Sequence, residues 1–448
     1  MNNVKCQELV ARDKRVIAPC QHLSYFPLAV AKGEGSILTD LDGNRFIDFL
    51  SSASSLNLGS THPAVTAEIQ TQLGKFTQYT QAYCYNQQAV EYAERLVSVY
   101  PGGVKAKVCF GNCGSDANDA AVKYARAYTG RQKVIVFLNG YHGNTYGSST
   151  MTTCSPKMHE KMGPFLPEIY AFPFYGVDKP DDVVERECLS QMHAAFASYL
   201  PVNEVAAVVI EPMQGDGGML PAHPVFIKKL YELCRESGIL FISEEVQQGF
   251  YRTGKFFAIE HYRDVVPGGL VPDGIVMGKS IGGGLTLGAF MGRSEIMDCL
   301  PAPAHLFTLG ANSISCAAGC AAFDIYHTAE FQKLLETNIE KAHCRAQKLQ
   351  KDHPKIVAFA RGLGLSLGIG IQKEDGTPDV EGTFKILYRS YEKGLVIISV
   401  GANVLRIQPP LNIPTPLLDE GFDILSAAMT EFENGQISDD VLKNRAGW

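Results

Sequence analysis

The sequence predicts an α/β protein with a large domain on a mostly parallel, mixed sheet and a smaller α+β domain at the C-terminal end. Helical stretches separate five short apolar runs, namely Val108 to Phe110, Val134 to Leu138, Val205 to Ile210, Ile239 to Ile242 and Ile275 to Met277. Runs so uniformly apolar, spaced by helices, are typical of parallel strands covered on both faces. After about residue 325 the pattern changes to a long, charge-rich helix followed by shorter elements, which indicates the second domain.

The chain of 448 residues is long enough for two or three domains. We predict that residues 61–325 form the large domain and residues 326–448 the small one. Residues 1–60 are expected to form an N-terminal segment that packs with the small domain. The sequence contains no internal repeat and no low-complexity linker that would favour another division.

The first hundred residues, taken in order, predict strands and then a helix. Asp42-Gly43 is typical of a hairpin turn between two strands, and the small polar residues Ser51 to Ser55 indicate a loop. Helical spacing then runs from Pro63 to Tyr100 and ends at Pro101-Gly102-Gly103.

The later elements alternate between the two types. A helix opens after Gly111 and continues through Ala127. In the small domain the pattern predicts a long helix through Gln350, a strand interrupted by glycine from Gly362 to Ile371, and a last helix from Leu417 to Phe432.

Composition and charge exclude several classes of function. The formal net charge is -7 and no basic run is present that could bind a phosphate backbone, so nucleic acid is not an expected partner. Met1 to Arg15 carries charged residues throughout, and no segment approaches the length of a membrane span. The twelve cysteines lack metal-ligand spacing and are expected to be free thiols in a reducing cytosol. We therefore expect a cytoplasmic protein without a membrane anchor or a metal site.

The stretch from Pro272 to Gly284 is the most informative for chemistry. Ile275 to Met277 predict a buried strand that stops at Lys279, beside the glycines Gly282 to Gly284. A lysine at such a strand end, in surroundings of low polarity, becomes nucleophilic and can form a Schiff base with an aldehyde. The glycines would let a cofactor approach the backbone. The alternative is an ordinary surface lysine beside a flexible loop. The residues at the other strand ends are needed to distinguish the two interpretations.

Two further strand ends carry residues suited to a flat, phosphorylated cofactor. Gly114 and Ser115 follow the first strand and open a helix, where unpaired backbone N–H groups and the helix dipole can bind phosphate. Tyr141 follows the next strand, and its ring can stack on a flat molecule. A glycine turn with Ser115 as N-cap and a core position for Tyr141 are the alternatives.

Acidic residues follow the next two strands. Glu211 and Asp216 come after the apolar strand that ends at Ile210, and Glu244 comes after Ile242. Carboxylates are costly to bury at such positions unless they are paired or used. Glu244 is suited to hold a pyridine nitrogen protonated, which makes the ring an electron sink. Capping or solvation of the strand ends would also explain these residues, but their order along the chain, closing on Lys279, is specific.

With these motifs the chain resembles, from about residue 25 to its C-terminus, the class III aminotransferase family of fold-type I pyridoxal-phosphate enzymes. The resemblance implies that pyridoxal 5'-phosphate is the cofactor and that Lys279 binds its aldehyde. Position by position, Gly114 and Ser115 would hold the phosphate, Tyr141 would stack on the ring, and Glu244 would face the ring nitrogen.

The same resemblance implies roles for three more residues. Gln247 would hydrogen-bond the ring hydroxyl group, and Arg406 would bind the α-carboxylate of an amino-acid substrate. Thr308 matches a threonine that reaches the phosphate of the neighbouring subunit's cofactor. A homodimer, or a higher oligomer such as a tetramer, with shared active sites is therefore implied.

The chain departs from the family pattern at positions that bear on the reaction. The family's usual residue at the ring nitrogen is Asp, whereas this chain has Glu244. Members that use 2-oxoglutarate often carry an arginine soon after the Tyr-His-Gly motif, where this chain has Asn144, and a Glu where it has Asp216. A dicarboxylate needs a cation at each end, and the sequence points to Arg406 alone.

These departures resemble a branch that isomerises nonpolar amino acids and includes isoleucine 2-epimerase. The same resemblance extends to four segments: Ser51 to Ser55, Gly114 to Ala120, Pro303 to Thr308 and the closing Gly447-Trp448. Such a reaction removes the proton from Cα on one face and returns it on the other. Lys279 would serve one face and Asp216, directly or through a water, the other. A class III aminotransferase acting on an ω-amine or amino acid with a 2-oxo acid acceptor is the alternative.

Overall fold

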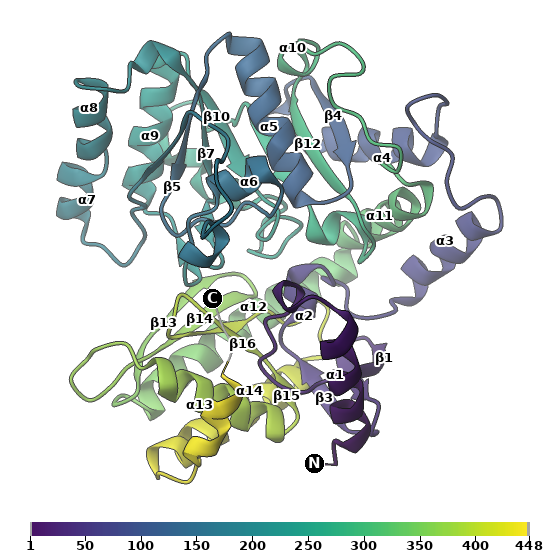
Figure 1. The fold of residues 1–448 in the computed structure, drawn as a ribbon, viewed down its shortest axis with the longest axis vertical. Coiled ribbons are helices and arrows are strands. Elements are labelled where there is room, and N and C mark those ends of the chain that lie inside the picture. The colour runs from purple at the N-terminus through teal and green to yellow at the C-terminus, as the bar shows by residue number, and fades with distance from the viewer. Residues whose placement is uncertain (1, 446–448) are drawn as a thin grey trace. The chain divides into compact units, whose positions relative to one another are not determined.

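The computed structural model describes residues 2–445, and the chain divides into two compact units (Figure 1). One unit comprises residues 63–327, and the other combines the first 62 residues with those from 328 onward. Gly447-Trp448, which contributes to the resemblance, lies outside the described residues.

The unit of residues 63–327 is built on a seven-stranded sheet with the order β4-β12-β11-β10-β7-β5-β6. Its strands are β4 (Ala106–Gly111), β5 (Lys133–Phe137), β6 (Ile169–Phe172), β7 (Val205–Ile210), β10 (Leu240–Glu244), β11 (Gly274–Met277) and β12 (Gly288–Arg293). The pairings β11–β10, β10–β7, β7–β5 and β5–β6 are parallel, whereas β12 runs antiparallel to both β11 and β4. The predicted mostly parallel, mixed sheet is confirmed, and all five predicted apolar runs are strands of it.

Helices cover both faces of this sheet. Alanines of α5 (Gly114–Thr129) pack on one face, against a cluster that includes Val209, Ile242 and Val276. Phe226 of α9 (Pro224–Ser237) packs on the other face, with its ring centroid 5.3 Å from that of Phe137. Because side chains alternate along a strand, Glu244 points to the same face as Ile242, the face that α5 covers.

The prediction of one continuous helix from Pro63 to Tyr100 was wrong in the middle of this range. The structure has α3 (Pro63–Leu73) and α4 (Gln87–Ser98), separated by an irregular segment that begins at Gly74. The side chain of Asn86 accepts hydrogen bonds from the backbone N–H groups of Gln88 and Ala89, so a new helix starts there. The other helices of the unit are α6 (Tyr146–Met151), α7 (Asp181–Glu187), α8 (Ser190–Phe196), α10 (Ser294–Met297) and α11 (Ser313–Tyr326), and β8 (Met213–Gln214) pairs with β9 (Leu220–Pro221).

The second unit contains two four-stranded sheets. The first has the order β1 (Val30–Glu34), β2 (Ile37–Asp40), β3 (Arg45–Asp48), β15 (Leu395–Val396), and the second β13 (Val357–Leu363), β14 (Ser366–Ile371), β17 (Val404–Ile407), β16 (Ile398–Val400). The parallel pairing of β3 with β15 joins the N-terminal segment to the C-terminal part of the chain. Its helices are α1 (Val4–Val16), α2 (Ser51–Ser54), α12 (Ala329–Asp352), α13 (Val380–Glu392) and α14 (Thr415–Glu433).

Two turns of this unit bear on the predictions. β2 and β3 form the predicted hairpin, and Gly43 takes a φ of 87° in its turn. In the predicted loop, all four residues Ser51–Ser54 have positive φ, from 48° to 67°, which makes a left-handed turn. The carboxylate of Asp48 accepts the backbone N–H groups of Leu50 and Ser51, each at 2.8 Å, and so anchors the start of that turn.

Across residues 2–445, we find no helix with both the length and the apolar character needed to cross a membrane. The twelve cysteines are all free thiols, as the sequence predicts.

Candidate active site

The residues predicted to carry the chemistry follow neighbouring strands of the large sheet. Tyr141, Glu211, Glu244 and Lys279 stand at or just beyond the carboxyl ends of β5, β7, β10 and β11. These strands run parallel, so their carboxyl ends meet along one edge of the sheet, where α/β proteins bind ligands.

Lys279 lies beside the start of α5. It follows β11 with a φ of 50°, a left-handed conformation that a lysine adopts only where the surrounding structure imposes it. A Cβ atom on the preceding Gly278 would lie 2.9 Å from the Cα atom of Gly114 and 3.0 Å from Cγ1 of Val246. Only a glycine allows this approach, which brings the lysine next to the helix N-terminus.

The N-terminus of α5 has the properties of an anion site. The first N–H groups of a helix have no partner within the helix, and the helix dipole is positive at that end. The carboxylate of Asp116 accepts the N–H groups of Asn112 at 2.7 Å and Cys113 at 3.1 Å and shapes the turn into the helix. Ser115 Oγ accepts the N–H of Asn144 at 3.1 Å, which joins this turn to the segment of Tyr141. The backbone N–H groups of Gly114 and Ser115 thus stand at a position where a bound anion is favoured.

Tyr141 is held from both ends. Its backbone N–H donates to Oε2 of Glu211 at 3.2 Å, and its hydroxyl oxygen accepts a hydrogen bond from Nδ2 of Asn144 at 3.0 Å. Burial and the neighbouring carboxylates, Asp216 first among them, raise the pKa of Tyr141 to about 12. The ring is thus neutral and fixed at the strand end.

Three carboxyl groups cluster at this edge. Glu211, Asp216 and Glu244 are all buried, and Asp216 is 7% exposed. Burial, with the charges of Glu244 and Asp216, raises the pKa of Glu211 well above its usual range. Burial also raises the pKa of Glu244 to about 7, against the lowering effect of Lys279 and a hydrogen bond from Asn118. Glu211 and Glu244 therefore hold their protons more tightly than an exposed glutamate does.

Gln247 and Asp216 belong to adjacent loops of the same cluster. A Cβ atom on Gly215 would collide with Oε1 of Gln247, so the glycine lets the glutamine lie directly against the turn that carries Asp216. Gln248 Nε2 donates to the same Oε1 at 3.2 Å and fixes the orientation of the Gln247 amide. Glu211 Oε1 accepts the N–H of Gly215 at 3.4 Å, which ties this turn to Tyr141.

Two residues of the cluster were not among the predicted site residues. Glu211 bridges Tyr141 and Gly215, and its signal in the sequence was an acid directly after a strand of apolar residues. Asn118 donates through Nδ2 to Oε1 of Glu244 at 3.3 Å. No role was predicted for Asn118 itself, because its partners His142 and Glu244 come from distant segments.

Of the remaining predicted site residues, Thr308 lies on a different segment of this unit and Arg406 belongs to the other unit. Thr308 lies on an exposed segment, and its carbonyl oxygen accepts a hydrogen bond from Gln78 Nε2 at 3.2 Å. Among the described residues, no hydrogen bond or ion pair joins Thr308 to the buried carboxyl groups. Arg406 is buried on β17 of the other unit, where it pairs in register with Gly368 of β14 and Ile398 of β16.

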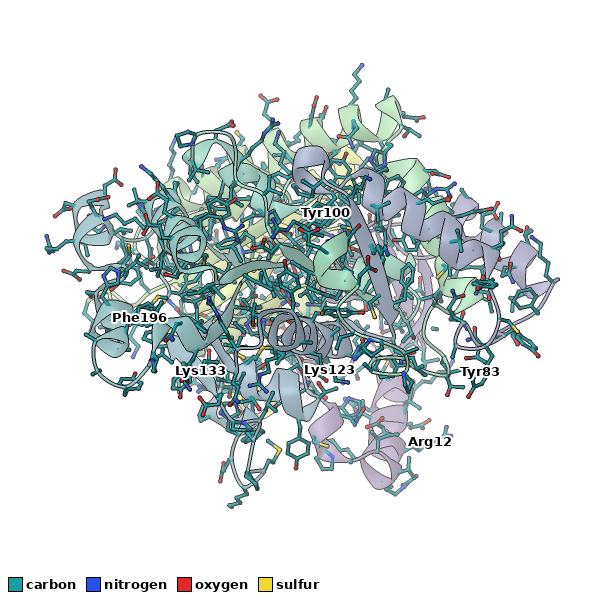
Figure 2. All side chains as sticks on the ribbon, turned by 90° about the horizontal axis from the view of Figure 1, so that it is seen from above. Arg12, Tyr83, Tyr100, Lys123, Lys133 and Phe196 are labelled. Atoms are coloured by element: carbon teal, nitrogen blue, oxygen red, sulfur yellow. The ribbon has the colours of Figure 1, made fainter. Side chains whose placement is uncertain are left out.

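The segment around Thr308 has an unusual surface. Hydrogen bonds from Asn312 Nδ2 to the carbonyl oxygen of Thr77 and to Gln78 Oε1 hold it against the irregular segment that follows α3. Apolar and aromatic side chains are exposed on both segments: Phe76, Tyr79, Tyr83, Tyr85, Leu306 and Leu309. Tyr83 lies at the periphery in Figure 2. We call these six residues the aromatic patch.

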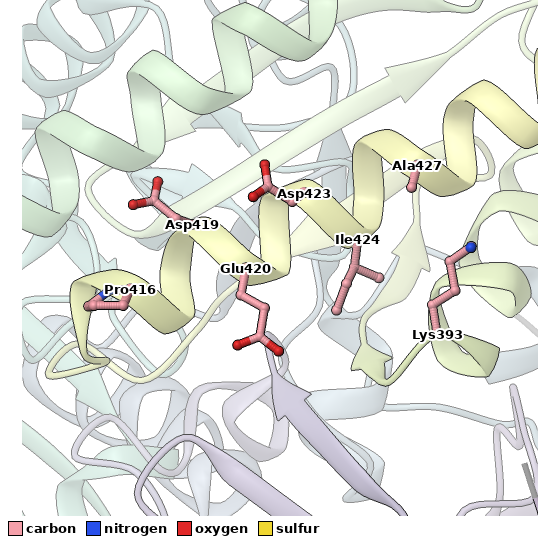
Figure 3. A pocket seen from close by; sticks show the side chains of 7 residues that line it. All are labelled: Lys393, Pro416, Asp419, Glu420, Asp423, Ile424 and Ala427. Atoms are coloured by element: carbon pink, nitrogen blue, oxygen red, sulfur yellow. The ribbon is translucent and has the colours of Figure 1, made fainter.

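A depression of about 690 Å³ beside α14 in the other unit is a different kind of surface (Figure 3). Its acidic side chains are paired, Asp419 with Lys341 at 2.7 Å and Glu420 with Arg45 at 3.2 Å. Its lining residues include none of the predicted site residues, so we do not regard it as the active site.

Comparison with known proteins identifies the family. The aminotransferase class-III family matches residues 19–429. The chain is 38% identical to the isoleucine 2-epimerase of Lentilactobacillus buchneri and 34% identical to the leucine/methionine racemase of Thermococcus litoralis, in each case over 99% of both chains. Its fold is similar to that of a transaminase from the marine bacterium Virgibacillus, with a TM-score of 0.86, 23% identity and coverage of 96% of this chain and 99% of the other.

The chain belongs to the class III aminotransferase family, as its motifs predict. This is a family of pyridoxal-phosphate enzymes, and pyridoxal phosphate is the cofactor.

The residues at the strand ends fit this cofactor. Gly114 and Gly278 pack closely on each other and on Val246, so neither position has room for a side chain of its own. A helix N-terminus suits a phosphate, a primary amine suits an aldehyde, and a buried carboxylate suits a protonated pyridine nitrogen.

Proposed function

We propose that the protein is an isomerase that racemises or epimerises nonpolar, branched-chain amino acids at Cα, for example L-isoleucine to D-allo-isoleucine. The observation that carries the proposal is the burial of a second acid/base group, Asp216, in the same cluster as Lys279. Both groups act electrostatically on Glu244, so both lie near the position proposed for the cofactor ring.

Seven residues would hold the cofactor. The backbone N–H groups of Gly114 and Ser115 would bind the phosphate, and Lys279 would bind the aldehyde. The Tyr141 ring would stack on the cofactor ring, Glu244 would face its nitrogen, Gln247 would hydrogen-bond its hydroxyl group, and the partner's copy of Thr308 would reach its phosphate. Bound pyridoxal phosphate draws electrons away from Cα of the amino acid and so makes its proton acidic.

The chain's own groups then decide where the proton goes. Lys279, once the substrate amine has displaced it, takes the proton from Cα on one face or returns it there. Asp216, directly or through a water, does the same on the opposite face. Two groups on opposite faces allow the configuration to invert, whereas a single base returns the proton to the face it came from.

The residues proposed to bind the substrate favour an amino acid with one carboxylate. Arg406 would bind the α-carboxylate through its planar, two-pronged guanidinium group. Asn144 occupies the place of the arginine expected in users of 2-oxoglutarate, and its amide donates to the Tyr141 hydroxyl oxygen. The likeness to the isoleucine 2-epimerase and the leucine/methionine racemase supports the same substrate class.

The second candidate is a class III aminotransferase that uses a 2-oxo acid acceptor. The family description and the transaminase fold of the structural relative favour it. It shares every cofactor-binding residue with the first candidate and differs only in where the proton is returned. Assays rather than binding data must therefore distinguish the two.

We further propose a homodimer, or a higher oligomer, in which each subunit completes its partner's site. The aromatic patch supports this, since it exposes six large apolar side chains on two segments, one of which carries Thr308. Large apolar side chains exposed together on two hydrogen-bonded segments are typical of an interface. The free cysteines support a reducing compartment such as the cytoplasm.

Incubation of the holoenzyme with L-isoleucine in deuterium oxide, without any 2-oxo acid, tests the proposal. We expect chiral chromatography and mass spectrometry to show D-allo-isoleucine with deuterium at Cα. Lys279→Ala is the control and should abolish the reaction. Product that appears only after a 2-oxo acid is added would replace the isomerase with the aminotransferase.

A further inference from the structure

Asn118 connects three parts of the candidate site. It lies one turn into α5 and its side chain is 0% exposed. Its amide nitrogen Nδ2 is 3.1 Å from the carbonyl oxygen of Gly114, 2.8 Å from that of His142, and 3.3 Å from Oε1 of Glu244. One buried side chain thus contacts the start of the phosphate-binding helix, the Tyr141 segment and the carboxylate at the end of β10.

The surroundings fix the orientation of this amide. All three neighbours of the nitrogen are oxygens, and Oδ1 has no hydrogen-bond partner among the described residues. The reversed orientation would set an oxygen against three oxygens, so the NH₂ group faces them. Two of the acceptors are backbone carbonyls, which never change charge. The contact with Glu244 is the one of the three whose strength depends on protonation.

Glu244 has a particular need for such a contact. Glutamate has one more rotatable bond than the family's usual aspartate, so its carboxylate has more conformations available. Nδ2 has two hydrogens for three acceptors, so Oε1 shares one hydrogen with a carbonyl group, and the two carbonyl groups fix the direction from which this donor approaches Oε1. The same hydrogen bond favours the ionised carboxylate, which burial and the nearby Asp216 disfavour.

We propose that Asn118 is a positioning residue that keeps Glu244 oriented and ionised, so that the cofactor's ring nitrogen stays protonated. The inference rests on the proposed function in one respect, since it takes Glu244 as the partner of that nitrogen. Without the donor, the proton shared by Glu244 and the ring nitrogen moves toward the carboxylate. Electron withdrawal from Cα then weakens, although every group that touches the cofactor is still in place.

The experiment is nitrogen-15 spectroscopy of holoenzyme reconstituted with pyridoxal phosphate labelled at the ring nitrogen, because the chemical shift of this atom reports its protonation directly. Near neutral pH we expect a protonated signal for the native protein and a shift toward the unprotonated position for Asn118→Ser. We also expect kcat for isomerisation to fall about tenfold with little change in KM, the effect of losing one hydrogen bond to a charged group.

Three further variants separate this role from a purely structural one. Asn118→Leu keeps the side-chain volume without a donor and should shift the signal as Asn118→Ser does. Asn338→Ser is the matched control, because Asn338 is also 0% exposed and donates to the carbonyl oxygens of Leu411 and Ile413, in the other unit. It should leave the signal unchanged. In a Glu244→Asp background, whose carboxylate is one methylene further from the amide, Asn118→Ser should change kcat less than about twofold.

A protonated signal in both Asn118 variants would overturn the inference, and so would an equal loss of kcat in the native and Glu244→Asp backgrounds. An unprotonated nitrogen in the native holoenzyme would overturn it together with the role of Glu244. A signal that depends on Asn118 in a protein that does not isomerise L-isoleucine would leave this inference standing and reject the proposed reaction, so the two failures are distinct.

Discussion

Burial of Glu244 favours its protonated form, whereas its proposed role requires the ionised form. The carboxyl group is 3% exposed and its pKa is raised to about 7, mainly by burial, yet its proposed role beside a protonated ring nitrogen requires its negative charge. Lys279 and Asn118 lower this pKa, while Asp216 raises it. Because the pKa lies near neutrality, small changes around Glu244 are expected to change its charge.

Cofactor binding should therefore depend on pH. Below about 7, Glu244 of the cofactor-free protein is protonated and must release a proton to pair with the cationic ring, so the Kd for pyridoxal phosphate should rise as the pH falls, by up to about tenfold per unit. Above about 7, Glu244 is already ionised and this contribution disappears. Spectrophotometric titration with pyridoxal phosphate at several pH values gives the Kd of the native protein and of Glu244→Gln. The difference between the two pH profiles is the contribution of Glu244. Parallel profiles would contradict the assigned role.

Single residues were predictable from the sequence where a strand end marks them. Lys279, Tyr141 and Glu244 each follow an apolar run, and the structure places each at the same edge of one sheet. Asn118 and the bridging role of Glu211 were not predictable, because their partners are backbone groups and side chains of other segments. Such contacts depend on the packing of α5 and the loops, which a local pattern does not encode.

At the scale of elements, β11 carries the lysine and is fixed at its start by a buried acid. Asp273, 1% exposed, precedes β11 and accepts the N–H of Phe241 in β10 at 2.8 Å. It also pairs with Arg293 at the end of β12, at 2.9 Å, and with Arg235 of α9. This ion cluster ties β11 to both neighbouring strands and to the helix behind them.

Asp273→Ala should lower the free energy of unfolding by about 3 kcal/mol, because it removes the acceptor of a buried N–H and the carboxylate partner of Arg235, and leaves Arg293 paired with Glu295 alone. The value stays at the low end of the range for buried pairs, since both arginines are about a third exposed. Urea denaturation measures it. Asp298→Ala is the control: Asp298 pairs with Lys107 on the surface, both more than half exposed, and should cost less than about 1 kcal/mol. Equal effects of the two variants would refute the stabilising role of the ion cluster.

Element prediction succeeded for the apolar parallel strands and failed where the pattern was ambiguous. The strand β12 (Gly288–Arg293) was not predicted, because it has a glycine near each end and a basic last residue. It nevertheless pairs with β4 and β11 along its length. The break between α3 and α4 was missed because the residues around it keep a helix-compatible spacing, and the Asn86 cap competes with continuation of the helix.

At the scale of the whole molecule, the aromatic patch is the feature that a single chain leaves unexplained. It lies next to Thr308, which no hydrogen bond or ion pair among the described residues joins to the carboxyl cluster of its own chain. Association of two copies through the patch would bury its apolar side chains and give Thr308 a role.

Tyr79→Glu should therefore shift the protein toward monomer and weaken cofactor binding, as measured by light scattering coupled to size-exclusion chromatography and by cofactor titration. Tyr199→Glu provides a matched control, since Tyr199 is 63% exposed against 64% for Tyr79 but lies beyond α8, away from the patch. It should leave the oligomer intact. Dissociation by neither variant, or by both, would show that the patch is not the interface.

Lys279 and Asp216 are proposed to exchange the Cα proton on opposite faces of the substrate. Asp216→Asn, which keeps the shape and removes the base, tests it most directly when L-isoleucine and D-allo-isoleucine are incubated separately in deuterium oxide. We predict that interconversion falls at least about a hundredfold, while one of the two isomers still exchanges its α-hydrogen for deuterium with retention of configuration. Interconversion near the native rate, or equal loss of exchange from both isomers, would contradict the account.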